Sequence, residues 1–582
     1  MSIVIKKPGL PRRKKRSSQR WVVLLSFSIL SSVIFAASNP ATSAPPYNII
    51  LIISDQETFH LYPARGYQLP ARAMLAQHGV TFTNHYTAAA MCSPSRAALL
   101  TGVPPQVNGV FDQMEYAYVP ALNPQRPNMG SVLKNLGYRT AYFGKFEMNK
   151  NLLEDKDTVN YSLLAKPYGF DVFNYEGDVG GTPQQGYSVD SFFAGEAIQW
   201  LRQNAQPDQK NTQPFFMVIS LLNPHDIMYG DANLPGTPQA QKPQAPVILP
   251  PPVNTLYAKQ WRFDLPKTLQ ESLTAAGMPN ALYEYQKGWS GTLGFIPTER
   301  KDMWQYYYNY YLNALRDNDR SLQQVVDTID EMDLWKNTVV IVTADHGEMG
   351  GAHGGLRGKG PMVYEENSHI PLTIAHPTGG HGTKNNALTS HLDLLPTLVG
   401  LTGLPADQRD TVVKNFPGHD FSPLLMSAKQ DVHAVRSAIL FNYVGISTID
   451  GDYLLKTLTH SVTNKTLPSL TEVNMNKRGF LAFVFDGRYK YARFYAPSAF
   501  NMPQTIEDIF KYNDVQLFDL QSDPNEANNL ALNPKKNKEL ILRMNNLLNT
   551  LMAQEVGEEN NAGDFLPQSI QGRAHAVTFT VN

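Results

Sequence analysis

The single cysteine of this sequence, Cys92, opens the run CSPSRAALLTG at residues 92–102. One cysteine excludes an intramolecular disulfide and also a cysteine-based zinc site, which needs two or more thiolates. Pro94 stands where prolines occur in the first turn of a helix, so one interpretation is a buried cysteine before a helix. Arg96 follows one helical turn later, and its planar guanidinium can hold an oxyanion. The run therefore places a sulfur atom beside a fixed positive charge.

Two carboxylates follow apolar runs elsewhere in the chain. Asp55 comes directly after YNIILIIS at 47–54, and Asp345 comes shortly after TVVIVT at 338–343. Because ligands bind at the carboxyl ends of parallel strands, these two carboxylates are expected to lie together at one edge of a sheet. Oxygen donors of this kind suit a hard divalent cation. Taken alone, either residue is equally well explained as a strand-end turn or a helix cap.

Strand and helix patterns alternate around these residues. Continuous apolar runs predict buried parallel strands at 47–54, 138–143, 215–222 and 338–343. Helical patterns lie between them at about 70–79, 129–136, 189–203 and 303–332. This alternation predicts an α/β fold with a large, mixed but mostly parallel sheet sandwiched by helices.

Two further regions have different patterns. Residues 228–300 are interpreted as an inserted surface loop, because 234–253 is dense in proline and glutamine. Beyond about Ser437, short alternating runs and a polar-faced helix predict a smaller antiparallel sheet with a packing helix, at 438–443, 480–485, 489–495 and 535–553. The sequence therefore predicts a catalytic domain at 46–436 and a C-terminal subdomain at 437–582.

Composition and charge exclude some classes of function. The 582 residues are 42% hydrophobic and 17% charged, a mixture that can bury a sizeable core. Fifty Lys and Arg against 51 Asp and Glu exclude a strongly basic nucleic-acid binder. Residues 1–37 hold eight basic side chains and no acidic one, and they end in an apolar run at 21–37. This order predicts a signal peptide over 1–38 and export to the periplasm or the exterior, with an uncleaved membrane anchor as the alternative.

The run at 92–102 resembles the signature of the type I sulfatases, C-x-P-S-R-x-x-x-x-T-G, in the alkaline phosphatase-like superfamily. The resemblance implies that a formylglycine-generating or maturase enzyme oxidises Cys92 to Cα-formylglycine (3-oxoalanine). A hydrated aldehyde offers two hydroxyl groups on one carbon, so one can attack sulfur and the other can later expel sulfate. Such a hydroxyl is a weak nucleophile until a metal lowers its pKa.

The same resemblance implies one divalent cation beside residue 92, coordinated by Asp55, Gln56, Asp345 and His346 together with the modified Cys92. The pairs Asp-Gln and Asp-His depart from the commoner sulfatase pairs Asp-Asp and Asp-Asn, and match choline sulfatases and phosphonate monoester hydrolases. Calcium is the expected ion. Manganese is the alternative ion, because a donor set that includes one imidazole suits calcium less well than a set of four oxygens does.

The resemblance also implies that four further side chains surround the sulfuryl group, namely Arg96, Lys145, His225 and Lys359. Of these, His225 and Lys359 are expected to assist the leaving oxygen as hydrogen-bond donor or general acid. Glu147 stands where the family's Gly-Lys-x-His stretch has a histidine; it could bind a cationic substrate group, act as a base, or point away. His353, in a glycine-rich loop, is a weaker candidate.

Three functions are consistent with these residues. The first is an arylsulfatase-like hydrolase of sulfate monoesters, acting on a small molecule or a glycan with formylglycine and a divalent cation. The second is a phosphonate monoester or phosphodiester hydrolase on the same scaffold, since the two tetrahedral oxyanions differ little in shape. The third is a non-catalytic relative that binds sulfate or a glycan, for which only Glu147 argues. The resemblance covers residues from about 46 to 553.

Overall fold

The computed structural model describes residues 46–62, 65–154, 160–206, 213–244, 247–463, 466–557 and 563–577. The predicted signal peptide lies outside these residues. Within them, no helix combines the length and the apolar character that a membrane crossing requires.

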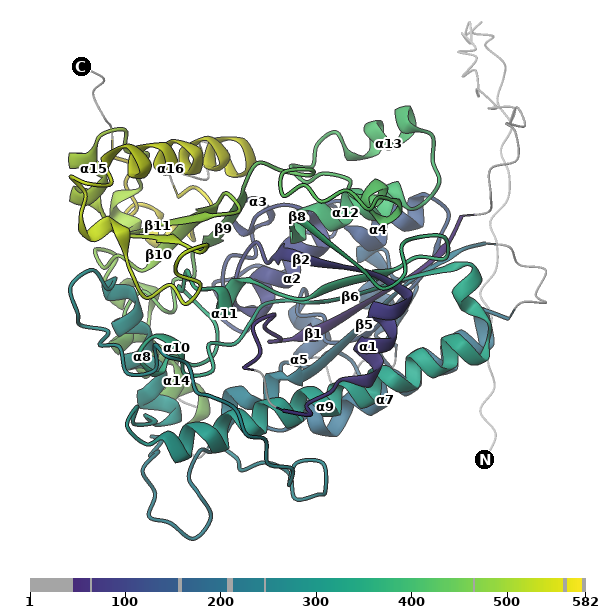
Figure 1. The fold of residues 1–582 in the computed structure, drawn as a ribbon, viewed down its shortest axis with the longest axis horizontal. Helices are drawn as coiled ribbons and strands as arrows, with labels where there is room; N and C mark the ends of the chain where they lie inside the picture. The colour runs from purple at the N-terminus through teal and green to yellow at the C-terminus, as the bar shows by residue number, and fades with distance from the viewer. Residues whose placement is uncertain are drawn as a thin grey trace, which may run out of the picture. The chain divides into compact units, whose positions relative to one another are not determined.

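A large eight-stranded sheet organises the chain up to Ser390 (Figure 1). Its strands are β1 Asn48–Asp55, β2 Gly79–Tyr86, β3 Arg139–Gly144, β4 Val172–Phe173, β5 Phe215–Pro224, β6 Thr338–Ala344, β7 Leu372–Ala375 and β8 Thr383–Ser390. Their order is β4-β3-β5-β1-β6-β7-β2-β8, and every described pairing is parallel except those of β7 with β6 and β2. The prediction of a mixed, mostly parallel sheet is confirmed.

Helices cover both faces of this sheet. The longer ones are α1 Pro70–His78, α2 Cys92–Thr101, α4 Met129–Asn135, α7 Gln185–Asn204, α9 Lys301–Glu331 and α12 His391–Gly400. On β1, Ile50 and Ile52 belong to one buried cluster with α1, α7 and α9, whereas Ile49, Leu51 and Ile53 belong to another with α2, α4 and α12. Burial on both faces explains why the central strands are continuously apolar rather than alternating.

A smaller four-stranded antiparallel sheet follows, in the order β12-β11-β10-β9 (Figure 1). Its strands and accompanying helices are β9 Ile439–Tyr443, β10 Phe480–Phe485, β11 Tyr489–Tyr495, β12 Asn513–Asp519, α14 Gly451–Val462, α15 Ile506–Tyr512 and α16 Lys538–Leu551. Gly487 turns the β10–β11 hairpin with a φ of +91°. One face of this sheet packs with Met544 of α16, and the other packs Phe441 and Phe494 against Met91, the residue before α2. The predicted antiparallel sheet is thus confirmed, and it supports the segment that carries Cys92.

Several elements differ from expectation. The patterns do not predict β2, β7 and β8, because strands such as TKNNALTS mix polar with apolar residues. The region 228–300, expected to be a loop, contains the helix α8 Asn280–Leu293, which packs against α14 through the close approach of Gly288 to Leu454. The smaller sheet also carries α14 and α15 besides the one expected helix. The domain boundary after residue 436 stays a prediction.

The remaining short helices include α3 Pro105–Asn108, α5 Lys150–Glu154, α6 Ser162–Ala165, α10 Ala352–Gly355, α11 Glu365–Ser368, α13 Ala406–Val413, α18 Gln568–Gln571 and the 3₁₀ helix η2 His225–Tyr229. Two of them begin at residues of functional interest. η2 starts at His225, directly after β5, and α11 starts at Glu365.

Candidate active site

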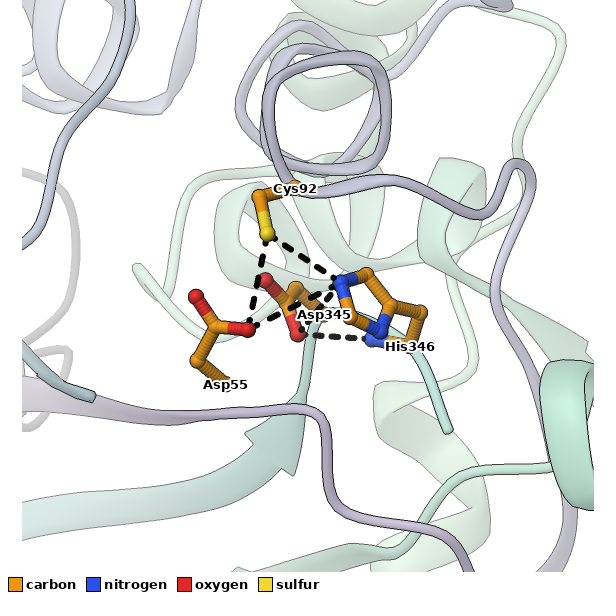
Figure 2. A group of neighbouring side chains, drawn as sticks. All are labelled: Asp55, Cys92, Asp345 and His346. Carbon is orange, nitrogen blue, oxygen red and sulfur yellow. Dashed lines mark hydrogen bonds and ion pairs between the residues drawn. The ribbon is translucent and has the colours of Figure 1, made fainter. Parts of the chain in front are cut away.

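Four buried side chains from three elements converge on one point (Figure 2). Asp55 ends β1, Cys92 begins α2, and Asp345 and His346 follow β6. The two carboxylates meet because β1 and β6 are neighbouring parallel strands, with Ser54 paired to Ala344. One potential ligand atom from each of the four residues lies within 4.8 Å of the others. The predicted gathering at one sheet edge is therefore what the structure contains.

Cys92 occupies the first position of α2, and every residue of that helix is buried. Its Sγ lies 3.6 Å from Asp55 Oδ1 and 3.4 Å from His346 Nε2. Ser95 fixes the helix to the strand end by donating a hydrogen bond from Oγ to the Asp345 carbonyl at 2.5 Å. Burial, and after it the negative charge of Asp55, raises the pKa of the Cys92 thiol far above its ordinary value. The thiol is therefore held in its protonated, weakly nucleophilic form.

His346 directs a nitrogen lone pair at the two carboxylates. Its Nδ1 lies 3.1 Å from the Gly347 carbonyl, so Nδ1 carries the hydrogen and Nε2 is the free acceptor. Nε2 lies 3.6 Å from Asp345 Oδ1 and 3.7 Å from Asp55 Oδ1. Burial lowers the pKa of His346 to about 4, so the ring is neutral at pH 7. Two carboxylates facing an imidazole lone pair form a donor set that a divalent cation would satisfy.

Gln56 connects this cluster to Lys359. Its backbone adopts a φ of +74°, and its amide donates to Asp345 Oδ1 at 3.0 Å. Its side-chain Oε1 accepts a hydrogen bond from Lys359 Nζ at 2.6 Å, while Nε2 donates to Glu348 Oε2 at 2.5 Å. The amide orientation is thus fixed from both ends. A carbonyl oxygen has two lone pairs, so Oε1 can accept from Lys359 and still offer a lone pair to a cation.

Two cations neutralise the carboxylates from the other side. Arg96 Nη2 lies 3.1 Å from both Asp55 Oδ2 and Asp345 Oδ2, and Nη1 donates to Ser220 Oγ and to the Lys145 carbonyl. Lys145 Nζ lies 2.8 Å from Asp55 Oδ2. Burial alone would raise the pKa of Asp55, but Lys145 and then His225 and Arg96 hold it well below its usual value. Asp55 is therefore an ionised carboxylate despite complete burial.

Glu147 belongs to the same network. Its Oε1 lies 3.0 Å from Lys145 Nζ, and its Oε2 accepts a hydrogen bond from Ser93 Oγ at 3.2 Å. Its backbone has a φ of +53° and is anchored by the carboxylate of Asp178, which accepts the Glu147 amide hydrogen at 2.7 Å. In this geometry Glu147 is a charge partner for Lys145, next to the segment that carries Cys92.

Formal charges in this buried network nearly cancel. The carboxylates are Asp55, Asp345, Glu147 and Glu348, and the cations are Arg96, Lys145 and Lys359. With His346 neutral, the network carries one net negative charge, which a divalent cation would convert to one net positive charge. A sulfate monoester carries one negative charge, so the charge of the loaded network would be equal to it in size and opposite in sign.

His225 and His353 differ in their surroundings. His225, the first residue of η2, is buried, and its Nδ1 has no hydrogen-bond partner among the described residues. Burial, and then the nearby charge of Lys359, lowers the pKa of His225. Gly181 makes room for the ring, since a Cβ there would lie 2.7 Å from His225 Cε1. His353 instead stacks on Tyr364 and contacts Glu271 at 2.9 Å, which are packing contacts away from the Cys92 cluster.

Sequence reasoning missed several side chains that hold the site together, namely Ser93, Asp178, Ser220 and Glu348. Ser220 lies inside an apolar strand, where a serine gives no signal. Glu348 follows His346 by two residues, and that proximity to a metal-ligand pair is the one clue available from the sequence.

Comparisons with known proteins bear on the family and the fold. A family model described as Sulfatase matches residues 47–404. Arylsulfatase K of Homo sapiens is 23% identical over 551 residues, which cover 91% of this chain and 88% of that protein. The solved complex of BT4656 with its substrate D-glucosamine-2-N,6-O-disulfate has a TM-score of 0.56 at 18% identity, covering 89% of this chain and 100% of that one. The phosphonate monoester hydrolase of Agrobacterium radiobacter has a TM-score of 0.58 at 20% identity, covering 88% and 96%.

At these identities the structural likeness shows a common fold. The family match goes further, because it spans more than half of the chain and contains all four residues of the buried cluster. The chain therefore belongs to the sulfatase family, the enzymes that hydrolyse sulfate esters.

Proposed function

We propose that this sulfatase acts at the Cys92 cluster, with Cys92 converted to formylglycine. The observation that carries the proposal is the position of Cys92 Sγ, in contact with both Asp55 and His346. A buried thiol with a raised pKa is a poor nucleophile, whereas a hydrated aldehyde at the same place offers two hydroxyl groups. Because Cys92 is fully buried, the modifying enzyme must reach it before the chain has folded.

The donors of the site support one divalent cation as the cofactor. Asp55, Asp345 and His346 would hold it, with the Gln56 amide oxygen as a further donor. When bound, the cation lowers the pKa of a hydroxyl group on residue 92 and so prepares the nucleophile. Calcium is the ion proposed first, and manganese is the alternative because it accepts imidazole more readily.

In the first step, one hydroxyl oxygen of residue 92 forms a bond to sulfur as the bond from sulfur to the alcohol oxygen breaks. Asp55 Oδ1 lies 3.6 Å from Sγ of the unmodified Cys92, so it is placed to accept the proton of the attacking hydroxyl on residue 92. Lys359 supplies a proton to the departing alcohol oxygen. His225, neutral at pH 7 because its pKa is lowered, contributes a hydrogen bond to the transferring group.

In the second step, the remaining hydroxyl of residue 92 passes its proton to the uncharged Lys359 left by the first step, Asp55 releases its proton to solvent, and the hydroxyl oxygen becomes the aldehyde oxygen. The bond from the same carbon to the sulfate oxygen breaks, sulfate leaves, and water rehydrates the aldehyde. Arg96 has both terminal nitrogens occupied by Asp55, Asp345, Ser220 and the Lys145 carbonyl, so it holds the carboxylates in position throughout.

The surroundings of Lys359 support a substrate with a second anionic group. A small cavity of about 20 Å³, enough for about one water molecule, borders Lys359 and Arg357. Buried Arg357 Nη1 has no hydrogen-bond partner among the described residues, and it could pair with a carboxylate or a further sulfate. The substrate of BT4656, which carries two sulfates, has this chemistry.

Phosphonate monoester hydrolysis is the second candidate. The Asp-Gln and Asp-His pairs favour it, and the protein from Agrobacterium radiobacter shares the fold. A phosphonate monoester carries one negative charge, as a sulfate monoester does, so the charge of the network suits either. Rates of the purified enzyme on an aryl sulfate and on the matching aryl phosphonate monoester separate the two.

Export is part of the proposal, on the basis of the basic and apolar pattern of residues 1–38. The decisive test of the mechanism is the mass of the peptide that contains Cys92, measured on enzyme whose turnover of an aryl sulfate has been determined. We expect the aldehyde or its hydrate. An unmodified thiol in fully active enzyme would contradict the formylglycine mechanism.

A further inference from the structure

A second cluster of metal-ligand side chains lies apart from the site described above. It consists of His60, in the loop after β1, Glu365 at the start of α11, and His369 directly after that helix. We propose that these three side chains bind a divalent transition-metal ion, for which zinc is the natural probe. The proposal is independent of the sulfatase chemistry.

The three candidate ligand atoms form a compact triangle. His60 Nε2 lies 3.2 Å from Glu365 Oε2 and 2.9 Å from His369 Nδ1, and His369 Nδ1 lies 2.7 Å from Glu365 Oε2. Zinc binds nitrogen and oxygen at about 2.0–2.1 Å, so ligands around a tetrahedral zinc are separated by about 3.3 Å. An ion therefore fits slightly above the plane of this triangle after small outward shifts of the ligands. Two histidines and one glutamate form a common protein set for such an ion.

The hydrogen bonds of His369 leave a place for a cation. Its Nε2 lies 2.9 Å from the Thr83 carbonyl, which requires a hydrogen on Nε2. In the neutral ring Nδ1 is then a bare lone pair, and it faces the Glu365 carboxylate at 2.7 Å. Two acceptors at this distance repel unless a cation or a shared hydrogen lies beside them, and the third ligand atom, His60 Nε2, lies 2.9 Å from Nδ1 and 3.2 Å from Oε2. Donation of the second ring nitrogen to a backbone carbonyl is also the usual way in which a metal-binding histidine is oriented.

Neighbouring residues hold the ligands in place before any ion binds. The His369 ring is stacked between Phe59 and Tyr86, with centroid distances of 4.3 and 4.6 Å. Tyr86 also donates a hydrogen bond from its hydroxyl to the Glu365 carboxylate, and Lys490 on β11 forms an ion pair with Glu365 Oε1. Oε2 thus stays directed at the two histidines. Little side-chain entropy remains to be lost on binding.

Local charge favours a cation as well. Lys490 is shared between Glu365 and Glu526, at 2.5 and 2.8 Å, so one ammonium group faces two buried carboxylates. The side chain of His60 is 42% exposed, against 8% for Glu365, so an ion can enter from solvent and complete its coordination with water.

An ion at this position would connect three separate parts of the chain. His60 follows the segment that carries Asp55 and Gln56, Glu365 and His369 flank α11, and Lys490 belongs to the smaller sheet. The structure therefore assigns the cluster a structural role: fixing the loop after β1 to α11. The competing explanation is a hydrogen on His60 Nε2 shared between His369 Nδ1 and Glu365 Oε2, or a second proton on His369; either would satisfy these contacts without any metal.

The test is the zinc content of the full-length enzyme after removal of metals and reloading with zinc. We expect His60→Gln to hold one zinc fewer per chain than the wild type, with affinity at this site weakened at least about 100-fold. The matched control is His433→Gln, which alters an exposed histidine elsewhere and should leave zinc content unchanged. Asp345→Asn should remove a different ion, so the two losses should add. Equal zinc content in His60→Gln and wild type would overturn the proposal and favour hydrogen bonding among the three side chains without a metal.

A measurement on the wild type covers the case in which His60→Gln folds poorly. Diethyl pyrocarbonate modifies accessible histidine nitrogens that are not bound to a metal. Zinc should slow the modification of His60 at least about tenfold, as read from peptide masses, and leave His433 unaffected. Modification of His60 at the same rate with and without zinc would refute the site.

Discussion

The ion pair between Lys145 and Glu147 allows a quantitative test of how the charge network is built. Lys145 Nζ lies 2.8 Å from Asp55 and 3.0 Å from Glu147, so the two carboxylates are less than about 6 Å apart. Lys145→Met removes the charge between them and keeps the length of the side chain. At an effective dielectric constant of about 20, the two carboxylates then repel by about 3 kcal/mol. Stranding buried charges costs about 3–5 kcal/mol in total.

Glu147→Gln should rescue that loss. On its own this substitution keeps the hydrogen bond from Ser93 and leaves Lys145 paired with Asp55, so we expect a cost of only about 1 kcal/mol. In the Lys145→Met background it removes the repulsion, and the double variant should be about 3 kcal/mol more stable than Lys145→Met. The double variant should therefore be more stable than the sum of the two single losses predicts, whereas independent losses would add.

The assay is urea unfolding of the four proteins in the presence of a chelator, so that metal binding does not contribute. The control is Lys134→Met, which breaks a surface ion pair with Asp171 whose side chains are 33% and 42% exposed, and should change stability by less than about 1 kcal/mol. A double variant no more stable than Lys145→Met would refute the view that Glu147 is the charge partner of Lys145.

Four further predictions concern residue 92 and the metal. Cys92→Ala should abolish turnover of an aryl sulfate while circular dichroism and the unfolding midpoint stay close to wild type; activity near wild type would reject Cys92 as the precursor of the nucleophile. Asp345→Asn should lower metal content and rate together, and normal metal occupancy would remove it from the ligand set. His346→Asn should shift binding preference from manganese towards calcium, because an amide oxygen replaces an imidazole; competition between the two ions would show it, and an unchanged ratio would contradict it. Because burial lowers the pKa of His346 to about 4, its nitrogen should bind metal from pH 7 down to about pH 5 and lose it only near pH 4; metal loss centred near the ordinary histidine pKa of about 6.5 would be incompatible with this.

The sequence was most informative where an apolar strand ends in a polar residue. Asp55 and Asp345 could be brought together in advance, because continuous burial on both sheet faces makes β1 and β6 conspicuous. The strands β2 and β8 could not be predicted from the sequence, since edge regions of the sheet tolerate polar residues. Glu147 was recognisable as a departure from the family pattern. Lys145 is only two residues away, but its pairing with Glu147 was not predictable, because Glu147 has a left-handed backbone with a φ of +53° that the sequence does not reveal.

The second metal cluster was invisible for a related reason. His60 and His369 are separated by 309 positions in the chain, and neither stands in a motif with a metal-ligand spacing. Only Glu365 and His369 show a helical i, i+4 relation, which is common among residues that merely pair with each other. The sequence therefore gives little information about a site whose ligands come from a loop and a short helix far apart in the chain.

The two departures at the active site can be understood as one coupled change. Gln56 stands where the commoner sulfatase pair has a second carboxylate, so one negative charge is missing beside the metal. Glu147 stands where the family has a histidine, so one negative charge is gained beyond Lys145, at 3.0 Å from it. The total charge of the buried network is thereby kept, while its distribution moves away from the metal.

This redistribution changes which group neutralises the substrate. Lys145 lies between two carboxylates and can offer less of its positive charge to a sulfuryl oxygen. A cation bound by Asp55, Asp345 and the neutral His346 would face only two anionic ligands, so more of its own charge would be available to the substrate. Such a cation would take over part of the electrostatic role of Lys145. Restoring a carboxylate at position 56 without removing Glu147 should therefore make the network too negative for an anionic ester.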